Sequence, residues 1–183
     1  MSEIVRETGE TTVTVRLQLS PPTEPVQIRT TDTVLDHMLA TLARYAGLNL
    51  AIEADGDLRH HLIEDVAISM GLALREIKPS TCQRFGHAMV PMDEALVEAA
   101  LDAGGRFYYE GRLPSTLFEH FFRSFAENAG LTLHVRVLRG RDRHHVVEAA
   151  FKATGFALHQ ALTRGEGVFS TKGAVRVKRK DER

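Results

Sequence analysis

The sequence predicts an α/β fold in which one chain forms two similar halves, with the helices of both halves packed between two mainly antiparallel sheets. Three observations lead to this prediction. The chain contains an internal duplication, each copy switches between helical and strand periodicity, and 183 residues fit one ordinary domain or two small halves that share a core. Hydrophobic residues make up 43% and charged residues 26%, which is typical of a globular protein.

The duplication is clearest in residues 33–74 and 116–158, which align with a single one-residue gap. Together with the strand-like sequence ahead of each block, the two repeats span about 8–82 and 83–165. We therefore expect a single domain over residues 1–183, made of these two repeats, a C-terminal segment and a short basic tail. The last six residues, KRKDER, are expected to be a solvated tail without function.

The first elements of each repeat are predicted to be strands followed by a short helix. The strand-like sequences are TVTVRLQL and VQIRT in one repeat and MVPMDEALVEAALDAG and RFYYEGRL in the other, although DEALVEAAL is also compatible with a helix by propensity. Apolar residues then recur at helical spacing over 35–46 and 118–129. Gly47 and Gly130 stand where these two helices end.

The remaining elements of each repeat are a strand and a longer helix. NLAIEA and TLHVRV alternate as strands do, and apolar stripes over 63–77 and 147–161 predict helices that face a core. One repeat alone exposes too much of this apolar surface. The helical faces of the two repeats are therefore expected to pack together, with the sheets outside.

Charge and cysteine content exclude several classes of protein. The chain has 23 basic and 24 acidic residues and a formal net charge of -1, which argues against a nucleic acid or an anionic membrane as the main partner. The single cysteine, Cys82, cannot form an internal disulfide, and the first ten residues lack the apolar stretch of a secretory signal. No apolar run is long enough for a membrane helix, so we expect a cytoplasmic protein.

The motifs HHLIE and HHVVE, which begin the two longer helices, predict metal binding. Residues three and four apart share a helix face, so each glutamate lies beside both histidines of its motif. Adjacent histidines point about 100° apart, so one pair can serve two different ions. A further histidine stands at the same place in each short helix. The candidate ligands are His37, His60, His61, Glu64, His120, His144, His145 and Glu148.

This ligand set predicts two sites with four protein ligands each. Four ligands leave open positions on a six-coordinate metal, which a catalytic site needs. Imidazole and carboxylate ligands suit manganese, iron, zinc or cobalt, and the sequence leaves this choice open. A single exposed histidine pair seldom binds metal, but its repetition with the same glutamate and companion histidine favours a site. His87, His134 and His159 have no duplicate partners and are expected to be surface or hydrogen-bonded core residues.

The sequence resembles imidazoleglycerol-phosphate dehydratases over essentially its whole length. The matching motifs are LDHML, HHLIED, RFGHAMVPMDEAL, FEHFFRSFAENAG, LTLHVRVL, HHVVEAAFKA and STKG. The resemblance implies dehydration of imidazole glycerol phosphate to imidazole acetol phosphate in histidine biosynthesis, assisted by two manganese ions, in a homo-oligomer of about 24 subunits. The same eight metal ligands carry over from the family.

The resemblance also implies residues that bind and convert the substrate. Glu10 of the GETT segment lies at the substrate in the family, and Glu10, Glu64 and Glu148 are candidates for moving protons, with the general base left open. A metal on the ring nitrogen would help the imidazole accept electron density as hydroxide leaves. Groups suited to a phosphate dianion carry over onto Arg84, Arg106, Lys152, Ser170 and Lys172.

The sequence departs from the family pattern at one loop, and two other functions stay open. The family carries a longer acidic loop, similar to HIDDHH, where this chain has only Arg59 between GDL and HHLIED. This difference leaves every ligand in place. A two-metal phosphatase would use similar groups. A non-catalytic shell protein held together by metal ions would not need the phosphate-binding residues.

Overall fold

The computed structural model of the chain describes residues 1–20 and 26–165. The candidate phosphate contacts Ser170 and Lys172 and the tail KRKDER lie outside the described residues. In chain order the elements are β1 (Ser2–Glu7), β2 (Thr11–Gln18), β3 (Gln27–Arg29), α1 (Thr33–Ala46), β4 (Asn49–Gly56), α2 (Arg59–Ile77), β5 (Phe85–Met92), β6 (Ala95–Asp102), β7 (Tyr108–Gly111), α3 (Thr116–Ala129), β8 (Thr132–Arg139) and α4 (Arg143–Leu162).

The two halves form sheets of the same topology. The first four-stranded sheet has the order β1-β2-β4-β3, and the second has the order β5-β6-β8-β7. In both sheets the three longer strands pair antiparallel, and the short outer strand pairs parallel with its neighbour. The prediction of two mainly antiparallel sheets is confirmed.

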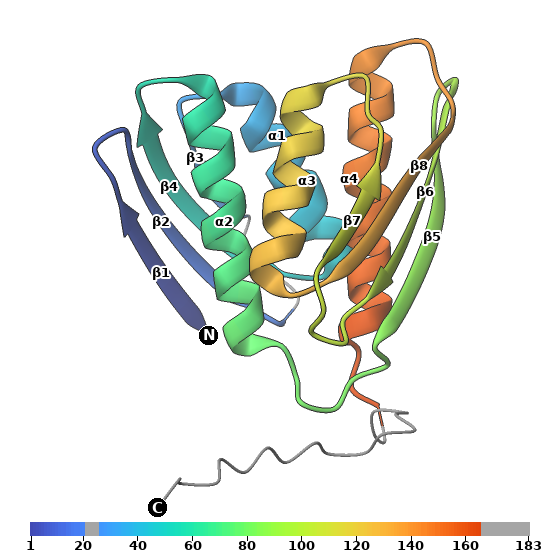
Figure 1. Cartoon of the computed structure of the whole chain (residues 1–183), viewed down its shortest axis with the longest axis horizontal. Helices are drawn as coiled ribbons and strands as arrows, with labels where there is room; N and C mark the ends of the chain where they lie inside the picture. Colours follow the sequence, from blue (N-terminus) through green and yellow to red (C-terminus); the bar gives the residue numbers. More distant parts are fainter. Residues whose placement is uncertain (21–25, 166–183) are drawn as a thin grey trace, which may run out of the picture.

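The helices lie between the two sheets, as the sequence predicts (Figure 1). In this view β1 to β4 lie on one side and β5 to β8 on the other, with α1 to α4 in the middle. Helix α2 packs against the first sheet and α4 against the second, while α1 packs on α4 and α2 on α3. Each helix pair therefore joins one helix from each half. Among the described residues, no helix has both the length and the apolar character needed to span a membrane.

The short helices α1 and α3 begin and end with the same signals. The side chains of Asp32 and Ser115 accept backbone N–H groups of the first turns, which satisfies donors that have no partner inside the helix. Gly47 and Gly130 end the helices with a φ of 65°, a left-handed conformation that favours glycine. These signals place the two helices at the positions that the periodicity predicts.

Glycine also permits the close contact within each helix pair. A Cβ on Gly71 of α2 would lie 2.7 Å from the carbonyl oxygen of Phe125 in α3. A Cβ on Gly155 of α4 would lie 2.8 Å from Cβ of Tyr45 and 3.0 Å from the carbonyl oxygen of Leu42 in α1. All three distances are shorter than ordinary contacts of a Cβ atom. These two equivalent glycines let α2 approach α3 and α4 approach α1 closely.

The segment MVPMDEALVEAALDAG forms the hairpin of β5 and β6, and the helical alternative for DEALVEAAL is wrong. Ala95, Val97, Ala99 and Leu101 are buried, and the residues between them are half-buried. This alternation is the pattern of a strand with one face on the core. Pairing of β6 with strands on both sides outweighs the helical propensity of its glutamates and alanines.

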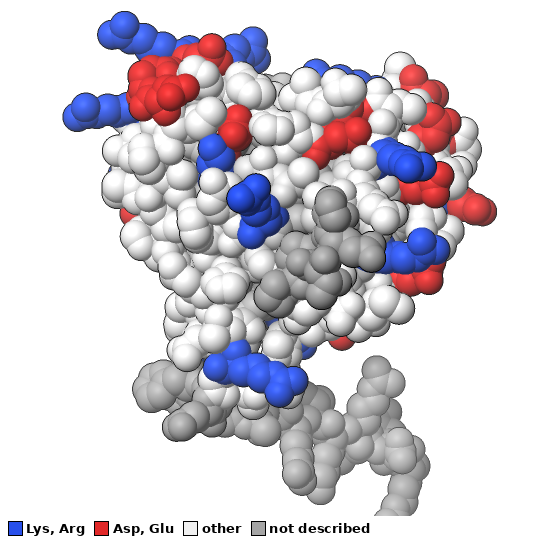
Figure 2. All heavy atoms as spheres, turned by 180° about the vertical axis from the view of Figure 1, so that it is seen from behind, with Lys and Arg blue, Asp and Glu red and all other residues white. Residues whose placement is uncertain are grey.

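Basic residues are spread over the surface seen in Figure 2. On this face lysine and arginine side chains stand apart from one another, and acidic side chains lie among several of them. The described residues therefore form no continuous basic surface on this face of the kind that nucleic-acid-binding proteins present.

Candidate functional site

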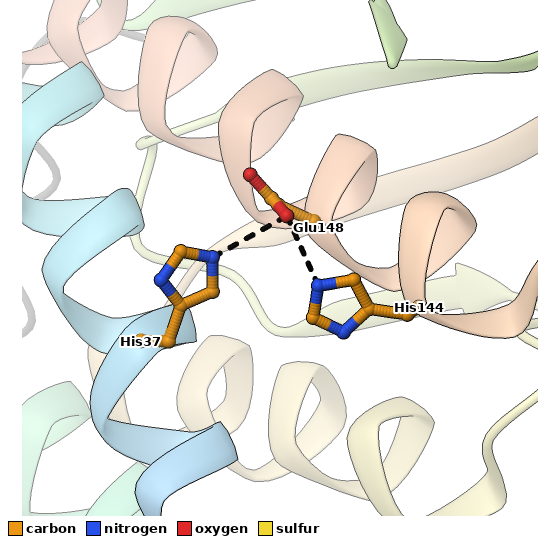
Figure 3. A group of neighbouring side chains, drawn as sticks. All are labelled: His37, His144 and Glu148. Carbon is orange, nitrogen blue, oxygen red and sulfur yellow. Dashed lines mark ion pairs between the residues drawn. The ribbon is translucent and has the colours of Figure 1, made fainter. Parts of the chain in front are cut away.

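The first metal-binding candidate is the α1–α4 cluster, which consists of His37, His144 and Glu148. Nε2 of His37 and Nε2 of His144 each lie 3.3 Å from Oε2 of Glu148. Figure 3 shows the two imidazole rings pointing at the same carboxylate from two different helices. The rings are nearly parallel, with centroids 6.0 Å apart. All three ligand atoms lie within 4.8 Å of one another, which is close enough to share one metal ion.

The second candidate is the α2–α3 cluster, which consists of His60, Glu64 and His120. Nε2 of His60 lies 3.7 Å from one carboxylate oxygen of Glu64, and Nε2 of His120 lies 3.1 Å from the other. The duplication relates this cluster to the first one, because each combines a histidine and a glutamate of a long helix with the histidine of a short helix. In both clusters the two helices come from different halves of the chain.

The donor atoms of both clusters fit a divalent metal ion. Nε2 of His120 is buried and makes no hydrogen bond, although it lies 3.1 Å from Glu64. A buried nitrogen without a hydrogen-bond partner is unusual, and a metal ion at the centre of the cluster would satisfy it. Imidazole and carboxylate ligands suit first-row transition metals such as manganese, iron, cobalt and zinc.

Glu148 is held in its ionised form. Its side chain is 9% exposed, and Nζ of Lys152 lies 2.9 Å from its Oε1. Burial raises the pKa of this carboxyl group, but hydrogen bonds with Lys152 and His37 outweigh that effect, so its pKa lies below the ordinary value. The glutamate of the other cluster, Glu64, is 35% exposed and has Ile68 at the position that corresponds to Lys152.

His61 and His145 lie outside both clusters, so each cluster contains three of the four ligands that the sequence predicts. Nδ1 of His61 lies 2.8 Å from Oδ1 of Asp57, and Nδ1 of His145 lies 2.7 Å from Oε2 of Glu94. These hydrogen bonds raise the pKa of both histidines. Metal-ligating histidines usually have such a carboxylate or carbonyl partner on the second ring nitrogen.

Glu10 lies in the turn between β1 and β2, beside His61. Its side chain is 58% exposed, and its Oε2 lies 3.4 Å from Nδ1 of His61. Its carbonyl oxygen accepts the N–H of Asp57 at 3.0 Å, which ties the turn to the start of α2. Of the three glutamates predicted to act on the substrate, Glu64 and Glu148 belong to the clusters and Glu10 does not.

The predicted phosphate contacts among the described residues lie at two places along α4. Lys152 lies at the α1–α4 cluster, but the N–H of Arg84 donates to the carbonyl oxygen of Ala161 near the other end of α4. At roughly 1.5 Å per residue, the helix separates Ala161 from Glu148 by about 20 Å. Arg84 is also paired with Asp102, at 2.6 and 2.8 Å.

Arg106 lies in the same region as Arg84. Its carbonyl oxygen accepts a hydrogen bond from the Thr132 hydroxyl at the start of β8, and Arg106 contributes to the lowered pKa of Asp102 after the larger effect of Arg84. Within a single copy of the chain, Arg84 and Arg106 therefore lie away from Lys152.

Sequence reasoning missed Asp57 and Glu94, the partners of the two outlying histidines. Asp57 stands four residues before His61, a spacing that places two side chains together at a helix start, and this signal was available in the sequence. Glu94 occupies the position in the second repeat that Glu10 occupies in the first. Aligning the strand turns as well as the helices would have found it.

The three histidines without duplicate partners join neither cluster. His87 pairs with Glu98 at 2.9 Å on the outer face of the second sheet, His134 contacts the ring of Tyr108, and Nδ1 of His159 lies 3.3 Å from the carbonyl oxygen of Ala46. These are the surface and hydrogen-bonded roles that the sequence predicts.

Comparison with known proteins gives one consistent family. The sequence model of imidazoleglycerol-phosphate dehydratase matches residues 30–158. The imidazoleglycerol-phosphate dehydratase of Granulibacter bethesdensis is 44% identical, and the match covers 94% of this chain and 97% of that protein. The enzyme of Pyrobaculum aerophilum is 45% identical, with 93% of this chain and 98% of that protein covered.

Solved structures of this family share the fold. The crystal structure of the Pyrococcus furiosus enzyme superposes with a TM-score of 0.84 at 39% identity and covers 94% of this chain and 100% of that chain. The imidazoleglycerol-phosphate dehydratase of Staphylococcus aureus gives a TM-score of 0.78 at 35% identity, with 89% and 98% covered. By sequence over nearly its full length and by fold, the chain belongs to the imidazoleglycerol-phosphate dehydratase family.

Proposed function

We propose that this chain dehydrates imidazole glycerol phosphate to imidazole acetol phosphate at sites built around its two histidine-glutamate clusters. Family membership assigns this carbon–oxygen lyase reaction of histidine biosynthesis to the chain. The observation that carries the proposed site is the convergence of two imidazoles on one carboxylate, twice, at equivalent positions of a duplicated fold.

Each cluster would hold one divalent metal ion, which the family resemblance indicates is manganese. His37, His144 and Glu148 would bind one ion, and His60, Glu64 and His120 the other. When bound, such ions supply Lewis acidity that polarises the substrate and stabilises negative charge on it. The low pKa of Glu148 supports its role as a ligand, because the ionised carboxylate is the form that binds a cation.

We further propose that His61 and His145 complete the metal sites of neighbouring copies of the chain. Both histidines are fixed by a carboxylate at Nδ1, the arrangement that orients a metal ligand through Nε2. Within residues 1–20 and 26–165, neither belongs to a metal-binding cluster of its own chain. A homo-oligomer would bring the fourth ligand to each site, and its size, 24 subunits by resemblance, is part of this proposal.

The same assembly would build the phosphate site. Lys152 is close to the α1–α4 cluster, whereas Arg84 and Arg106 are at the opposite end of α4. A second copy that presents Arg84 and Arg106 beside Lys152 would give a phosphate dianion two guanidinium groups and one ammonium group. Ser170 and Lys172 belong to the proposed phosphate contacts by resemblance.

Glu10 is the proposed proton-transfer residue that is not needed as a ligand. Its carboxylate is exposed beside His61 and can accept or donate a proton at a substrate atom held nearby. Glu64 and Glu148 stay candidates for the same role, but metal ligation would reduce their basicity. In the balanced dehydration the carbon next to the imidazole ring would lose its hydroxyl group as water and the following carbon would lose its proton. The resulting enol would take up a proton at the ring-adjacent carbon to give the ketone.

The test is dehydration of imidazole glycerol phosphate by purified protein that has been stripped with a chelator and then resupplied with manganese. Keto product and free phosphate are measured together. We expect keto product only with metal and no release of phosphate. Release of phosphate would indicate the two-metal phosphatase, and bound metal with no reaction would indicate the non-catalytic shell protein.

Two matched histidine variants locate the activity. His60→Ala removes a ligand of the α2–α3 cluster, and we expect it to lose metal and at least about 100-fold in kcat. His87→Ala removes a histidine that also faces a glutamate but lies outside both clusters. It should keep wild-type metal content and kcat. Equal losses in both variants would argue against the clusters as the site.

A further inference from the structure

Three polar side chains meet beneath the turn that joins β1 to β2. Asp65 of α2 accepts a hydrogen bond from the Thr11 hydroxyl, and Nε of Arg6 donates to Oδ1 of Asp65 at 2.9 Å. Thr11 is 4% exposed, and the side chain of Asp65 is 11% exposed. A carboxylate this buried is costly unless it is paired, and Thr11 and Arg6 provide the pairing.

Thr8 connects the turn to this polar group. Its hydroxyl oxygen accepts the N–H of Glu10 at 3.1 Å and the N–H of Thr11 at 3.0 Å, and it lies 3.1 Å from the Thr11 hydroxyl. These hydrogen bonds hold the backbone on both sides of Glu10. The Glu10 carboxylate itself stays 58% exposed beside His61. The turn is therefore fixed by its backbone while the Glu10 carboxylate remains mostly exposed.

The second half of the chain has no polar side chains at the three equivalent positions. The corresponding residues are Val90 for Arg6, Ala95 for Thr11 and Ala149 for Asp65, and all three are buried. The second half thus packs a strand hairpin against its long helix through apolar contacts alone at this place. The duplicated fold can therefore be built at this place without a polar group, and this difference points to a role for Asp65 beyond packing.

The glutamate of the corresponding turn is used differently in the second half. Glu94 accepts the N–H of Arg141 at 3.0 Å and the N–H of Asp142 at 2.7 Å, and it also contacts His145. These bonds lower its pKa to about 2. Where the polar group is absent, the glutamate itself anchors the turn. Where Asp65 anchors the turn, the Glu10 carboxylate stays mostly exposed and lies 3.4 Å from Nδ1 of His61.

We propose that Asp65 is a positioning residue that holds the β1–β2 turn through Thr11 and so keeps Glu10 beside His61 for proton transfer. This inference rests on the proposed function, in which Glu10 acts at the substrate. Asp65 itself contacts Thr11 and Arg6, so its effect on the reaction passes through the turn.

The test is a double-mutant cycle on the metal-loaded protein with Glu10→Gln, Asp65→Ala and the two changes together. We expect Asp65→Ala to lower kcat about 10- to 100-fold and to change KM less than about twofold, because a displacement near 1 Å is enough for such a loss. If Asp65 acts through Glu10, the double variant is no slower than Glu10→Gln alone.

The outcomes separate this inference from the proposed function. Losses that multiply in the double variant, or wild-type kcat in Asp65→Ala while Glu10→Gln is impaired, would overturn the positioning role alone. Wild-type kcat in Glu10→Gln would overturn the role of Glu10 and the inference with it. Thr11→Val keeps the branched shape and removes only the hydroxyl donor, so it must reproduce the loss of kcat if Asp65→Ala does not fold.

Glu76→Ala is the matched control. The Ser2 hydroxyl donates to Oε2 of Glu76 at 2.6 Å, which ties the other end of β1 to α2. This variant should keep wild-type kcat. Amide hydrogen exchange of the metal-free protein gives a second readout: exchange at Glu10 and Thr11 should be about 10-fold faster in Asp65→Ala and unchanged in Glu76→Ala. Unchanged exchange in both variants would contradict the proposal.

Discussion

The β1–β2 turn of the first half and the β5–β6 turn of the second half each place a glutamate beside the second histidine of a long helix. Glu94 is bound by two backbone N–H groups and His145, whereas Glu10 lies 3.4 Å from His61 with most of its side chain in solvent. Gene duplication supplies the same group twice. The difference shows that one copy can become part of the framework while the other stays available for chemistry.

The two histidine-glutamate clusters differ less than the two turns. Each has two histidines and one glutamate at equivalent positions, but Glu148 is more buried than Glu64 and is paired with Lys152. In the proposed function, Lys152 would supply a cation for the phosphorylated substrate at one cluster only. The clusters have the same residue types, and the residue one turn further along the helix, Lys152 or Ile68, distinguishes them.

The largest expected effect is the loss of a cluster glutamate. Glu148→Gln should lower kcat about 1,000-fold or more with the fold intact, since it removes a charged ligand. Glu64→Gln should lower kcat by a similar factor if the clusters are equivalent. Steady-state kinetics, metal content and the melting temperature of each variant check this. Full turnover in Glu148→Gln would remove this residue from the mechanism, and full turnover in Glu64→Gln alone would show that the clusters have different roles.

The next effect concerns the helix contacts that both halves share. Gly71→Ala and Gly155→Ala each place a methyl group against the backbone of the facing helix, so each should lower the free energy of unfolding by about 1–3 kcal/mol. Urea unfolding of the metal-free protein measures both values. Because the two contacts are equivalent in the duplicated fold, a loss in only one variant would show that the α1–α4 and α2–α3 contacts can adjust to different degrees.

Much of this architecture could be predicted because the duplication states each pattern twice. The helix stripes, the glycines after Ala46 and Ala129 and the motif HHLIE with HHVVE all appear in both copies. Positions with similar residues in both copies therefore indicate shared structural elements and candidate metal ligands. The polar group around Asp65 could not be found in this way, because its counterparts are apolar and the signal lies in a difference between the copies.

The sequence also could not show which ligands share a cluster. The direction of His61 and His145 depends on which side of each long helix faces its neighbour, and this follows from packing across the two halves. The distance between Lys152 and Arg84 depends in the same way on the hydrogen bond that ties Arg84 to the far end of α4. The spacing of the motifs gives neither the direction of these two histidines nor the distance between Lys152 and Arg84.

A pH-dependent difference is expected at the end of the second strand of each sheet. β6 ends at Asp102, which is paired with Arg84, whereas β2 ends at Gln18. The ion pair with Arg84 lowers the pKa of Asp102 below its ordinary value of 3.8. The ionised carboxylate therefore stabilises the fold above pH 3.8, and this contribution is lost as the pH falls through the lowered pKa.

Asp102→Asn tests this difference in the metal-free protein. The urea midpoint of the wild type should fall more steeply than that of the variant as the pH drops below about 4, and the two should converge at the acid end. Gln18→Asn, a neutral change at the equivalent strand end, should leave the pH dependence unchanged. Parallel pH profiles for Asp102→Asn and wild type would show that the ion pair does not stabilise the fold.

The smallest expected effect concerns the start of the two long helices. The Asp142 carboxylate accepts the N–H groups of His144 and His145 at the start of α4, whereas Leu58 begins α2 with no side-chain cap. Leu58 has a φ of -124° and a ψ of 141°, the extended conformation in which a capping residue can reach back to the first turn.

Asp142→Ala should therefore lower the free energy of unfolding by about 1 kcal/mol, and Leu58→Asn should raise it by about 0.5–1 kcal/mol relative to Leu58→Ala. The alanine variant controls for removal of an exposed leucine. Urea unfolding without metal measures the three values, and kcat measures whether a more stable start of α2 alters the site.

Higher stability with unchanged kcat would show that turnover does not require flexibility of the short loop before His60. If Leu58→Asn is no more stable than Leu58→Ala, the N–H groups at the start of α2 are already satisfied, and the contrast between the two helix starts has no energetic consequence.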